Sequence, residues 1–397
     1  MEQVSYKING EELTIYVAGR IDAAAAPAYE QAILSACAEN PHTKVVLDFK
    51  NVEYISSSGI RIVLKVKKTE KNVSVINVSL EIYDIFEMTG FTEIMDIQKA
   101  VRSFSVEGCK VIGEGAKGTV YRLNQDTIIK VYKDGVNKSD IDRERELAKK
   151  AFIVGIPTAL SYDIVDVDGQ MGSVFELLDA ETLSEVLARD EIGSEDFVKH
   201  VSDFARLLRE IHEIDADDSI PPIKPLFYKW LDQAKTVLTE EETARITELL
   251  DKMQSPKKIL HCDFHSNNVM IQNGEMLLID MDTLSQGSPA GELATVYDSY
   301  VGFLEAEEDG EKIDSFLGLS IAKSAAVWEI FFPIYMEGKS DSEKEHALNV
   351  VKVLGYLRVL RHYIRRGVMA SEQGQRIVEL ALAHLREALA CVDNLDM

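Results

Sequence analysis

Several features that would assign a protein to a special class are scarce or missing in this sequence of 397 residues. No uninterrupted apolar run approaches the length of a membrane span, and residues 1–5, MEQVS, do not resemble a signal peptide. No internal repeat or low-complexity stretch is visible. Cysteine is rare and scattered, at Cys37, Cys109, Cys262 and Cys391. Because these cysteines form no spaced motif, we expect a cytoplasmic protein in a reducing compartment, with no membrane partner.

Positive charge is also in short supply. The sequence has 43 Lys and Arg against 67 Asp and Glu, a formal net charge of −24. Such a chain would repel the phosphates of nucleic acid, which we exclude as a partner. The charge is compatible with a cationic substrate and equally with an ordinary solubilising surface. The remaining composition, 46% apolar and 28% charged, is globular, and the length suffices for two or three domains.

The most informative motif lies in the second half of the chain. Residues 261–268 read HCDFHSNN, and residues 278–282, LIDMD, end the apolar run that follows. The spacing HxDxxxxN, followed by a strand ending in Asp, is used by kinases and kinase-like phosphotransferases. Transfer of the terminal phosphate of ATP needs a carboxylate to orient the accepting hydroxyl, and an Asn and a second carboxylate to hold magnesium. Asp263, Asn268 and Asp280 supply that set in the expected order.

A glycine-rich segment stands upstream. Residues 113–121 read GEGAKGTVY, a GxGxxGxV loop in which missing side chains would let backbone N–H groups approach phosphates. A dinucleotide-binding fingerprint would continue into a helix. Here residues 119–123 and 127–132 are strand-like instead. We therefore predict a hairpin that closes over a nucleotide, with Lys130 reaching its phosphates.

Lys130 lies within an apolar strand and needs a charged partner. Residues 140–152 are predicted to form a helix, which Gly155 closes. Both Glu144 and Glu146 lie on it. We favour Glu144 as the ion-pair partner, with Glu146 as the alternative, and one of the two must be an ordinary surface charge.

From about residue 106 onward the chain resembles the protein-kinase-like superfamily, and more closely its aminoglycoside and choline phosphotransferase branch. The catalytic loop has Cys262 where HRD kinases have Arg, residues 280–282 stand in place of DFG, and no APE-like segment follows. The loop departs from the HGDxHxxN of this branch at Cys262, another small residue. The resemblance implies a bilobal α+β domain with a mostly helical C-terminal lobe.

The resemblance also implies roles for particular residues. Asp263 would be the catalytic base, and Lys130 and Glu144 would belong to the catalytic set. Asn268 and Asp280 would bind Mg²⁺, with Asp282 as a helper. The residues expected to bind ATP are Gly113, Gly115, Gly118, Val120, Lys130 and Glu176, the last in a hinge segment, residues 175–178, whose backbone would bind adenine.

Two histidines flank Asp263. His261 and His265 are not accompanied by a cysteine or histidine cluster of the zinc type. We expect His261 to make structural hydrogen bonds and leave His265 open as a residue that lines the site.

The first hundred residues have a different pattern. Residues 4–8 and 13–18 read as strands joined by an Asn-Gly turn. Strands are also expected at residues 44–49, 73–78 and 95–100, and helices at 23–38, from the serines at 56–58 to 67, and at 80–88. This alternation predicts an α/β domain.

This region resembles the STAS domain of anti-sigma factor antagonists and sulfate transporter tails. The residues that carry the resemblance are GRID at 19–22, LD at 47–48, SSGI at 57–60 and TGF at 89–91. In the antagonists the Ser before the helix-start Gly is phosphorylated, which corresponds to Ser58, although Ser56 replaces the Asp common there. A phosphate at a helix N-terminus is electrostatically favourable. The other interpretation is that Ser58 is a plain N-cap.

The region after residue 194 is mostly helical. Helices are predicted at residues 197–211, 240–253, 312–337, 342–366 and 372–391. Their aromatic residues, at 230, 328, 331, 332 and 335, are expected in the core more than at a substrate site. The arginines at 358, 361, 365 and 366 suggest a solvated or internally paired helix face.

We predict an α/β STAS-like domain at residues 1–104, a kinase-like N-lobe at 105–180 and a helical C-lobe at 181–397. The leading hypothesis is an ATP- and Mg²⁺-dependent phosphotransferase that acts on a hydroxyl acceptor and is coupled to a STAS signalling domain with a protein partner. A small-molecule acceptor is favoured, because no activation loop is recognisable. One alternative is an antagonist-type signalling switch whose kinase half phosphorylates a protein Ser or Thr, such as Ser58. The other is a nucleotide-binding pseudokinase.

Overall fold

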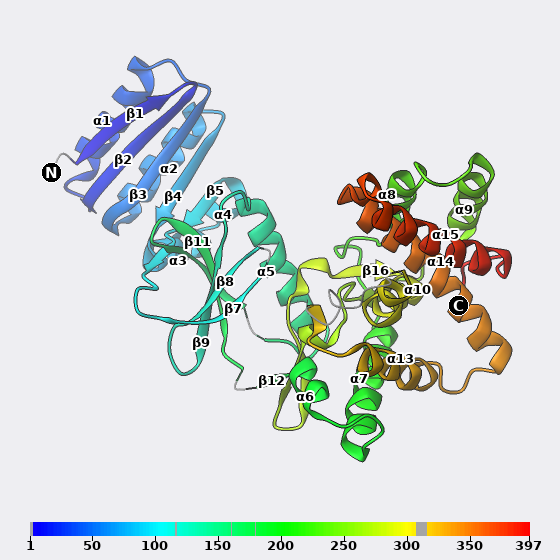
Figure 1. Cartoon of the computed structure of the whole chain (residues 1–397). Coiled ribbons are helices and arrows are strands. Elements are labelled where there is room, and N and C mark those ends of the chain that lie inside the picture. Colours follow the sequence, from blue (N-terminus) through cyan, green and yellow to red (C-terminus); the bar gives the residue numbers. More distant parts are fainter. Residues whose placement is uncertain (1–2, 116, 160, 179, 307–315) are drawn as a thin grey trace. The chain divides into compact units, whose positions relative to one another are not determined.

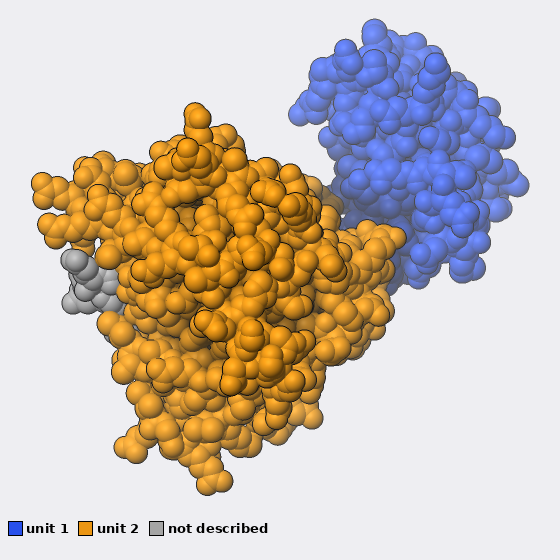
Figure 2. Space-filling view, turned by 90° about the vertical axis from the view of Figure 1, so that its right-hand side faces the viewer, with its two compact units in different colours: residues 1–105, 164–169 blue, residues 106–163, 170–397 orange. Residues whose placement is uncertain are grey.

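The computed structural model describes residues 3–115, 117–159, 161–178, 180–306 and 316–397. Contacts divide the chain into two compact units, shown in separate colours in Figure 2. Unit 1 comprises Met1–Ser105 and Ile164–Gly169, and unit 2 comprises Val106–Asp163 and Gln170–Met397. Within the described ranges, no helix is both long enough and apolar enough to cross a membrane.

Unit 1 contains a five-stranded sheet with the order β1-β2-β3-β4-β5 (Figure 1). The strands are β1 (Val4–Asn9), β2 (Glu12–Ile21), β3 (Lys44–Ile55), β4 (Val73–Val78) and β5 (Asp96–Lys99). The first two form an antiparallel hairpin, where Gly10 at φ +62° permits the tight turn. The later pairings are parallel, so each needs a crossover connection.

Helices supply those crossovers. They are α1 (Ala26–Glu39), α2 (Ser57–Thr69), α3 (Leu80–Met88) and the short α4 (Phe91–Ile94). Apolar side chains of β2 and β3, such as Leu13 and Leu47, share one core with Tyr29 of α1 and Val63 of α2. The predicted α/β architecture is therefore confirmed. The bounds of β4 and α3 equal the predicted ones, whereas β3 continues past residue 49 to Ile55.

A short strand, β6 (Arg102–Phe104), pairs in parallel with residues 165–167 of β10 (Ser161–Val167). In unit 2, β11 (Gln170–Glu176), β9 (Thr127–Tyr132), β8 (Gly118–Arg122) and β7 (Lys110–Glu114) are neighbours in a sheet, in that order. Strands β8 and β9 form the antiparallel hairpin that the sequence predicted, and β7 pairs antiparallel with β8 as well. The helix α5 (Lys138–Ile153) follows β9.

The rest of unit 2 is a helical lobe. Its long helices are α7 (Glu195–Glu213), α8 (Lys224–Ala234), α9 (Glu240–Lys252), α10 (Pro289–Tyr297), α13 (Ile321–Tyr335), α14 (Asp341–Arg365) and α15 (Glu372–Ala390). Small strands lie among them: β12 (Glu181–Thr182), β14 (Val269–Gln272) and β15 (Glu275–Leu278) form one sheet, and β13 (Lys258–Leu260) pairs with β16 (Ser285–Gly287). One apolar core joins this lobe to α5. The predicted fold class, an α/β domain followed by a kinase-like unit with a helical C-terminal part, is confirmed.

Some elements differ from prediction. The helix expected at residues 312–337 begins at Ile321, because Ser320 caps it and Gly318 adopts a positive φ of 69°. The residues before 316 in that prediction lie outside the described part. Helices α8 and α10 were not predicted, and a π-helical turn, η3 (Asp298–Gly302), continues α10. Trp230 and Phe331 are buried in the core, as expected for aromatic residues at helical spacing.

Candidate active site

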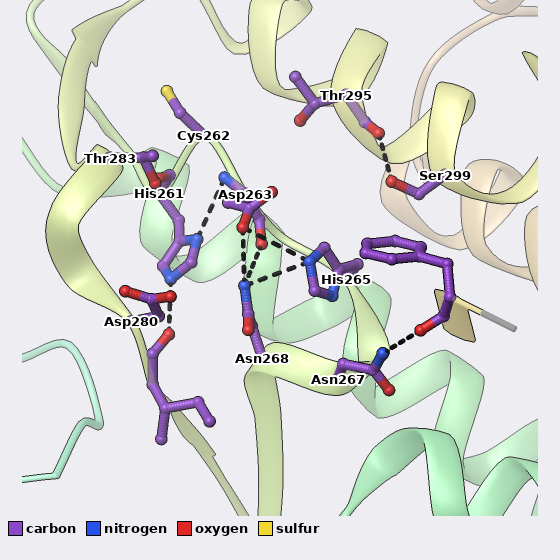
Figure 3. A network of polar contacts seen from close by, with 12 residues as sticks. His261, Cys262, Asp263, His265, Asn267, Asn268, Asp280, Thr283, Thr295 and Ser299 are labelled. Atoms are coloured by element: carbon purple, nitrogen blue, oxygen red, sulfur yellow. Dashed lines mark hydrogen bonds and ion pairs between the residues drawn. The ribbon is translucent and has the colours of Figure 1, made fainter. Parts of the chain in front are cut away.

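Three predicted site residues come together where β13 ends. The strand stops at Leu260, and the chain turns through residues 261–265 into the short helix η1 (Ser266–Asn268). The β14–β15 hairpin then returns the chain, so that Asp280 follows shortly after β15. Figure 3 shows Asp263, Asn268 and Asp280 around one space, with His261 and His265 beside them.

Asn268 and Asp263 are held to each other. The Asn268 side-chain nitrogen donates to the Asp263 backbone oxygen at 2.9 Å and to its carboxylate oxygen Oδ2 at 3.0 Å. His265 Nε2 lies 3.5 Å from the same carboxylate oxygen. The position of the carboxylate is thus set before any substrate binds, which favours directional contact with a hydroxyl.

The environment of Asp263 keeps it ionised. Burial by itself would raise the pKa of this carboxyl, but the hydrogen bond to His265 and the electrostatic effects of His265, His261 and Arg358 outweigh it and lower the pKa to about 2. A carboxylate with so low a pKa orients a hydroxyl and accepts its proton late, when the oxygen has already become acidic. That timing suits phosphoryl transfer through a loose transition state, in which positioning dominates.

His261 makes structural hydrogen bonds and has no exposed surface. Its Nδ1 accepts the backbone N–H of Asp263 at 3.3 Å, so its Nε2 carries the proton and donates to the oxygen of Ile279 at 3.1 Å. His265, which the sequence left open, is also buried and lines the space beside Asp263. Its Nδ1 has no hydrogen-bond partner among the described residues.

Cys262 occupies a position that favours glycine. Its φ is +65°, in the left-handed region that L residues rarely adopt. Burial and the nearby Glu292 carboxylate raise the pKa of its thiol well above the ordinary value. The left-handed backbone at this residue therefore has some conformational cost, which a small side chain tolerates. The raised pKa means that the thiol remains protonated at neutral pH.

Glu292 of α10 is a site residue that sequence reasoning missed. It is completely buried, and its carboxylate accepts the backbone N–H groups of His261 at 2.8 Å and Cys262 at 2.7 Å. His212 Nε2 lies 2.9 Å from it. One carboxylate thus binds the backbone at the start of the loop that carries Asp263. A signal was available, because Glu292 is the single charged residue in an otherwise apolar helix and such a group needs partners.

The donor set around Asp280 fits a magnesium ion. The nitrogen of Asn268 is engaged with Asp263, which leaves its amide oxygen as the atom available for a cation. Asp280 offers a carboxylate from a left-handed backbone conformation, φ 63° and ψ 66°. Hard oxygen donors of this kind are the ligands that Mg²⁺ prefers. Lys130 Nζ lies 3.8 Å from Asp280 Oδ1, so the same carboxylate also faces the lysine.

Lys130 of β9 pairs with Glu144 of α5. The distance from Lys130 Nζ to Glu144 Oε1 is 2.6 Å, and Glu144 is buried. Glu146 is exposed and corresponds to the ordinary surface charge. The neighbouring Tyr132 has its pKa raised, first by burial and then by the Glu144 carboxylate.

The three glycines of the β7–β8 hairpin differ in whether the surrounding structure leaves room for a side chain. A Cβ at Gly118 would lie 2.4 Å from the Val131 backbone oxygen, so close approach of β9 requires this glycine. A Cβ at Gly113 or Gly115 would meet only ordinary contacts at 3.8 Å or more. Packing within the chain therefore does not require glycine at these two positions. Val120 pairs with Lys130 across β8 and β9.

Two other expected residues lie at the edges of this region. Glu176 ends β11, opposite Thr127 of β9, and the next residue, Leu177, donates its N–H to the Asp126 oxygen. Asp282 forms an ion pair with Lys117 of the glycine-rich segment. The carboxylate of Asp282 is therefore directed to the loop, whereas Asp280 faces Lys130.

A buried contact between an acid and an arginine lies in the same lobe. Asp298 has no exposed surface, and Arg358 Nη1 of α14 lies 3.2 Å from its Oδ2. Burial raises the pKa of Asp298 to about 8, against the opposing effect of Arg358. Its Oδ1 has no hydrogen-bond partner among the described residues. Arg361 donates to Gln233, so these two arginines of the basic run are internally paired, as the sequence suggested.

Ser58 belongs to unit 1 and is not the N-cap of its helix. Ser56 has that role, since its hydroxyl accepts the Gly59 N–H and α2 begins at Ser57. Ser58 lies in the first turn, half-buried, and Arg61 Nη2 donates to its hydroxyl at 2.9 Å. The N-cap interpretation of Ser58 is therefore wrong, because the serine two residues earlier caps the helix.

Comparison with known proteins gives two family matches. The model described as "Phosphotransferase enzyme family" matches residues 108–322, and the model of the STAS domain matches residues 3–104. No curated protein sequence matches the chain.

Similar solved structures include an ADP-bound aminoglycoside phosphotransferase, APH(2'')-Ib, at 16% identity and a TM-score of 0.43, with 72% of this chain and 94% of that chain covered. A choline/ethanolamine kinase family protein from Mesorhizobium loti has 13% identity and a TM-score of 0.45, and the alignment covers 72% of this chain and 88% of that one. An anti-sigma factor antagonist from Mycobacterium paratuberculosis has 24% identity and a TM-score of 0.23, covering 24% of this chain and 83% of that chain.

Proposed function

The chain belongs to the phosphotransferase enzyme family and carries an N-terminal STAS domain, and we propose that it transfers the γ-phosphate of ATP to a hydroxyl acceptor in a magnesium-dependent reaction. The observation that carries this proposal is the joined pair of Asp263 and Asn268, which has Asp280 beside it and the Lys130–Glu144 ion pair facing Asp280. A carboxylate, an amide, a second carboxylate and a lysine are the groups that phosphoryl transfer from ATP uses.

In this proposal each side chain has one task. Asp263 accepts a hydrogen bond from the acceptor hydroxyl, orients its oxygen toward the phosphorus and takes the proton as the new O–P bond forms. Lys130 binds phosphate oxygens, and Glu144 holds the ammonium group in place. Asn268 and Asp280 would hold Mg²⁺, which when bound neutralises negative charge on the phosphates.

Nucleotide binding is assigned to the β7–β8–β9 region. Gly113 and Gly115 leave space for phosphates above their backbone, and Val120 lies in the neighbouring strand. Gly118 supports the same hairpin through its contact with β9. The end of β11 at Glu176 would supply backbone groups to adenine.

The acceptor is proposed to be a small molecule. The sequence has no APE-like segment after Asp280, so a recognisable platform for a protein substrate is missing. A protein Ser or Thr is the second candidate acceptor, and one observation favours Ser58. Its hydroxyl accepts a hydrogen bond from the Arg61 guanidinium, which would pair with a phosphate on this serine. The STAS domain is proposed to bind a protein partner, and the cytoplasmic location stays a prediction.

The test uses the purified full chain with Mg²⁺ and ATP, and hydroxyl compounds such as amino alcohols and amino sugars as acceptors. Intact mass and ADP release are both measured. Acceptor-dependent ADP release without a mass change supports a small-molecule kinase, whereas one added phosphate at Ser58 supports the signalling switch. Asp263→Asn should abolish either result, and the exposed Asp393→Asn should not. ATP binding without turnover, in the wild-type chain and in Asp393→Asn alike, would refute the proposal and leave a pseudokinase.

A further inference from the structure

Three side chains with metal-binding atoms meet in the STAS domain, outside the proposed active site. Cys37 lies in the last turn of α1, His42 in the loop between α1 and β3, and Glu70 directly after α2. Their ligand atoms all lie within 4.8 Å of one another. Among the described residues this is the one such group of three.

Topology explains why residues so far apart in sequence converge. Strands β2, β3 and β4 are parallel neighbours, so α1 and α2 both end at the edge of the sheet where β3 and β4 begin. The loop after α2 is hydrogen-bonded to the start of β3, which follows the loop after α1, since the Val45 N–H donates to the Asn72 oxygen at 2.9 Å. Ser58 lies at the opposite edge, in the first turn of α2.

The hydrogen bonds of His42 define which nitrogen can bind a cation. Nδ1 lies 2.7 Å from the Asn40 backbone oxygen, and because a carbonyl only accepts, Nδ1 carries a hydrogen. In the neutral ring Nε2 then has a bare lone pair, and it lies 3.2 Å from Glu70 Oε2. Two electron-rich atoms facing each other need a proton or a metal ion between them. An Nδ1–H bond to a backbone carbonyl is the outer contact that metal-binding histidines usually make.

The spacing suits a tetrahedral ion. With metal–nitrogen and metal–oxygen bonds of about 2.1 Å, two ligand atoms on a tetrahedral zinc lie about 3.4 Å apart, close to the His42–Glu70 distance. The sulfur of Cys37 lies within 4.8 Å of both atoms and must move closer to them to bind the same ion. A nitrogen, sulfur and oxygen combination suits zinc better than magnesium or calcium, which prefer oxygen alone.

A cysteine nucleophile activated by His42 is the competing interpretation of the same residues. Both ring nitrogens already face other groups, so neither is directed as a base to Cys37. Burial of Cys37, and then the Glu70 carboxylate, raise the pKa of the thiol to about 11. The thiol is therefore a poor nucleophile at neutral pH.

We propose that Cys37, His42 and Glu70 bind one zinc ion in the STAS domain, with water in the fourth position. On binding, the Cys37 S–H bond breaks, the sulfur–zinc bond forms and the proton leaves to solvent, without any change of oxidation state. The ion ties the end of α1 and the end of α2 to the loop before β3. Because the unfolded chain does not hold these residues together, zinc stabilises the folded STAS domain. This site is independent of the phosphotransferase reaction.

The test uses the full chain, freed of metal with a chelator and titrated with Co²⁺. We expect one cobalt per chain, with a thiolate-to-cobalt charge-transfer absorption and the visible bands of a four-coordinate ion, both removed by added Zn²⁺. Cys37→Ala should abolish the charge-transfer band. Cys391→Ala is the matched control, since Cys391 is exposed and lies in unit 2, and should leave the band unchanged.

Stability supplies a second readout that does not depend on the Cys37 variant folding. Zn²⁺ should raise the melting temperature of the wild-type chain, and the effect should disappear in Glu70→Gln, whose side chain is partly exposed. A wild-type chain with no charge-transfer band, or a band that persists in Cys37→Ala, would overturn the proposal and leave a plain His42–Glu70 ion pair. A melting temperature that Zn²⁺ does not change would do the same.

Discussion

Replacing Glu144 by Gln should weaken the proposed phosphotransferase site while the helix that carries it remains. Glu144 is only 6% exposed, and Lys130 Nζ lies 2.6 Å from its carboxylate. Removing one partner of a fully buried ion pair costs about 3–5 kcal/mol. Gln keeps the volume and an acceptor oxygen, and the Asp280 carboxylate lies 3.8 Å from the lysine as a second partner. We therefore expect the free energy of unfolding to fall by less than that, by about 2 kcal/mol.

The same change should reduce activity, because Lys130 would move toward Asp280 and compete there with Mg²⁺. A loss of about 2 kcal/mol in transition-state stabilisation corresponds to a decrease of about 30-fold in kcat/KM. The assay is Mg²⁺-dependent ATP turnover, with water as acceptor until the natural acceptor is known. Unfolding by urea is measured in parallel.

Glu146→Gln is the matched control, because it removes the same charge from an exposed position of the same helix. It should change stability by no more than about 0.5 kcal/mol and leave turnover near the wild-type value. Equal effects of the two substitutions on kcat/KM would refute the assignment of Glu144 as the residue that positions Lys130.

Other predictions concern Asp263, Asp298 and Cys262. Because the pKa of Asp263 is lowered to about 2, protonation of this carboxylate should not reduce ATP turnover above about pH 4. His265→Leu should move the acid limb of the pH profile of turnover upward by about one pH unit, since the burial of Asp263 would remain and the hydrogen bond would be gone. An unmoved limb would contradict the role of His265. Gly355→Ala places a Cβ 2.6 Å from Asp298 Oδ1 and should destabilise the fold by about 1–2 kcal/mol after the gain in helix propensity. Glu345→Ala, at an exposed position of the same helix, should be nearly neutral in urea unfolding. Cys262→Gly relieves the left-handed backbone and should keep turnover and change stability by less than about 1 kcal/mol, while Cys262→Val should cost more than about 2 kcal/mol by the same denaturation assay.

Much of the fold could be predicted because its signals are local. The Asn-Gly turn, the apolar strand at residues 73–78 and the helix at 80–88 each contain their own pattern, and the structure has β4 and α3 with those bounds. Local patterns were less informative near residue 320, where Ser320 starts α13 later than its apolar content suggested. The alternative in which Ser58 caps the helix was likewise wrong, since the consecutive serines at 56–58 differ only in the backbone angles that the fold imposes.

The candidate site divides in the same way. Motif spacing selected Asp263, Asn268 and Asp280 as candidates, because these residues lie on one short loop and hairpin and are close in sequence. The partner of Lys130 could be narrowed to two glutamates but not further. Helical periodicity alone does not say which face of α5 packs on the sheet, and tertiary packing buries Glu144 and exposes Glu146.

Residues that act at long sequence separation escaped prediction for a physical reason. Glu292 binds backbone N–H groups that lie about thirty residues earlier in the chain, at His261 and Cys262, and backbone groups leave no trace in the identity of the residues that carry them. A buried carboxylate that accepts several hydrogen bonds resists displacement, because removing it leaves those donors unsatisfied at about 1–3 kcal/mol each. The start of the loop that carries Asp263 is therefore bound by the single charged residue of an otherwise apolar helix. The HxDxxxxN motif specifies which groups are present, and the buried Glu292 on α10 binds the backbone at the start of the loop that carries them.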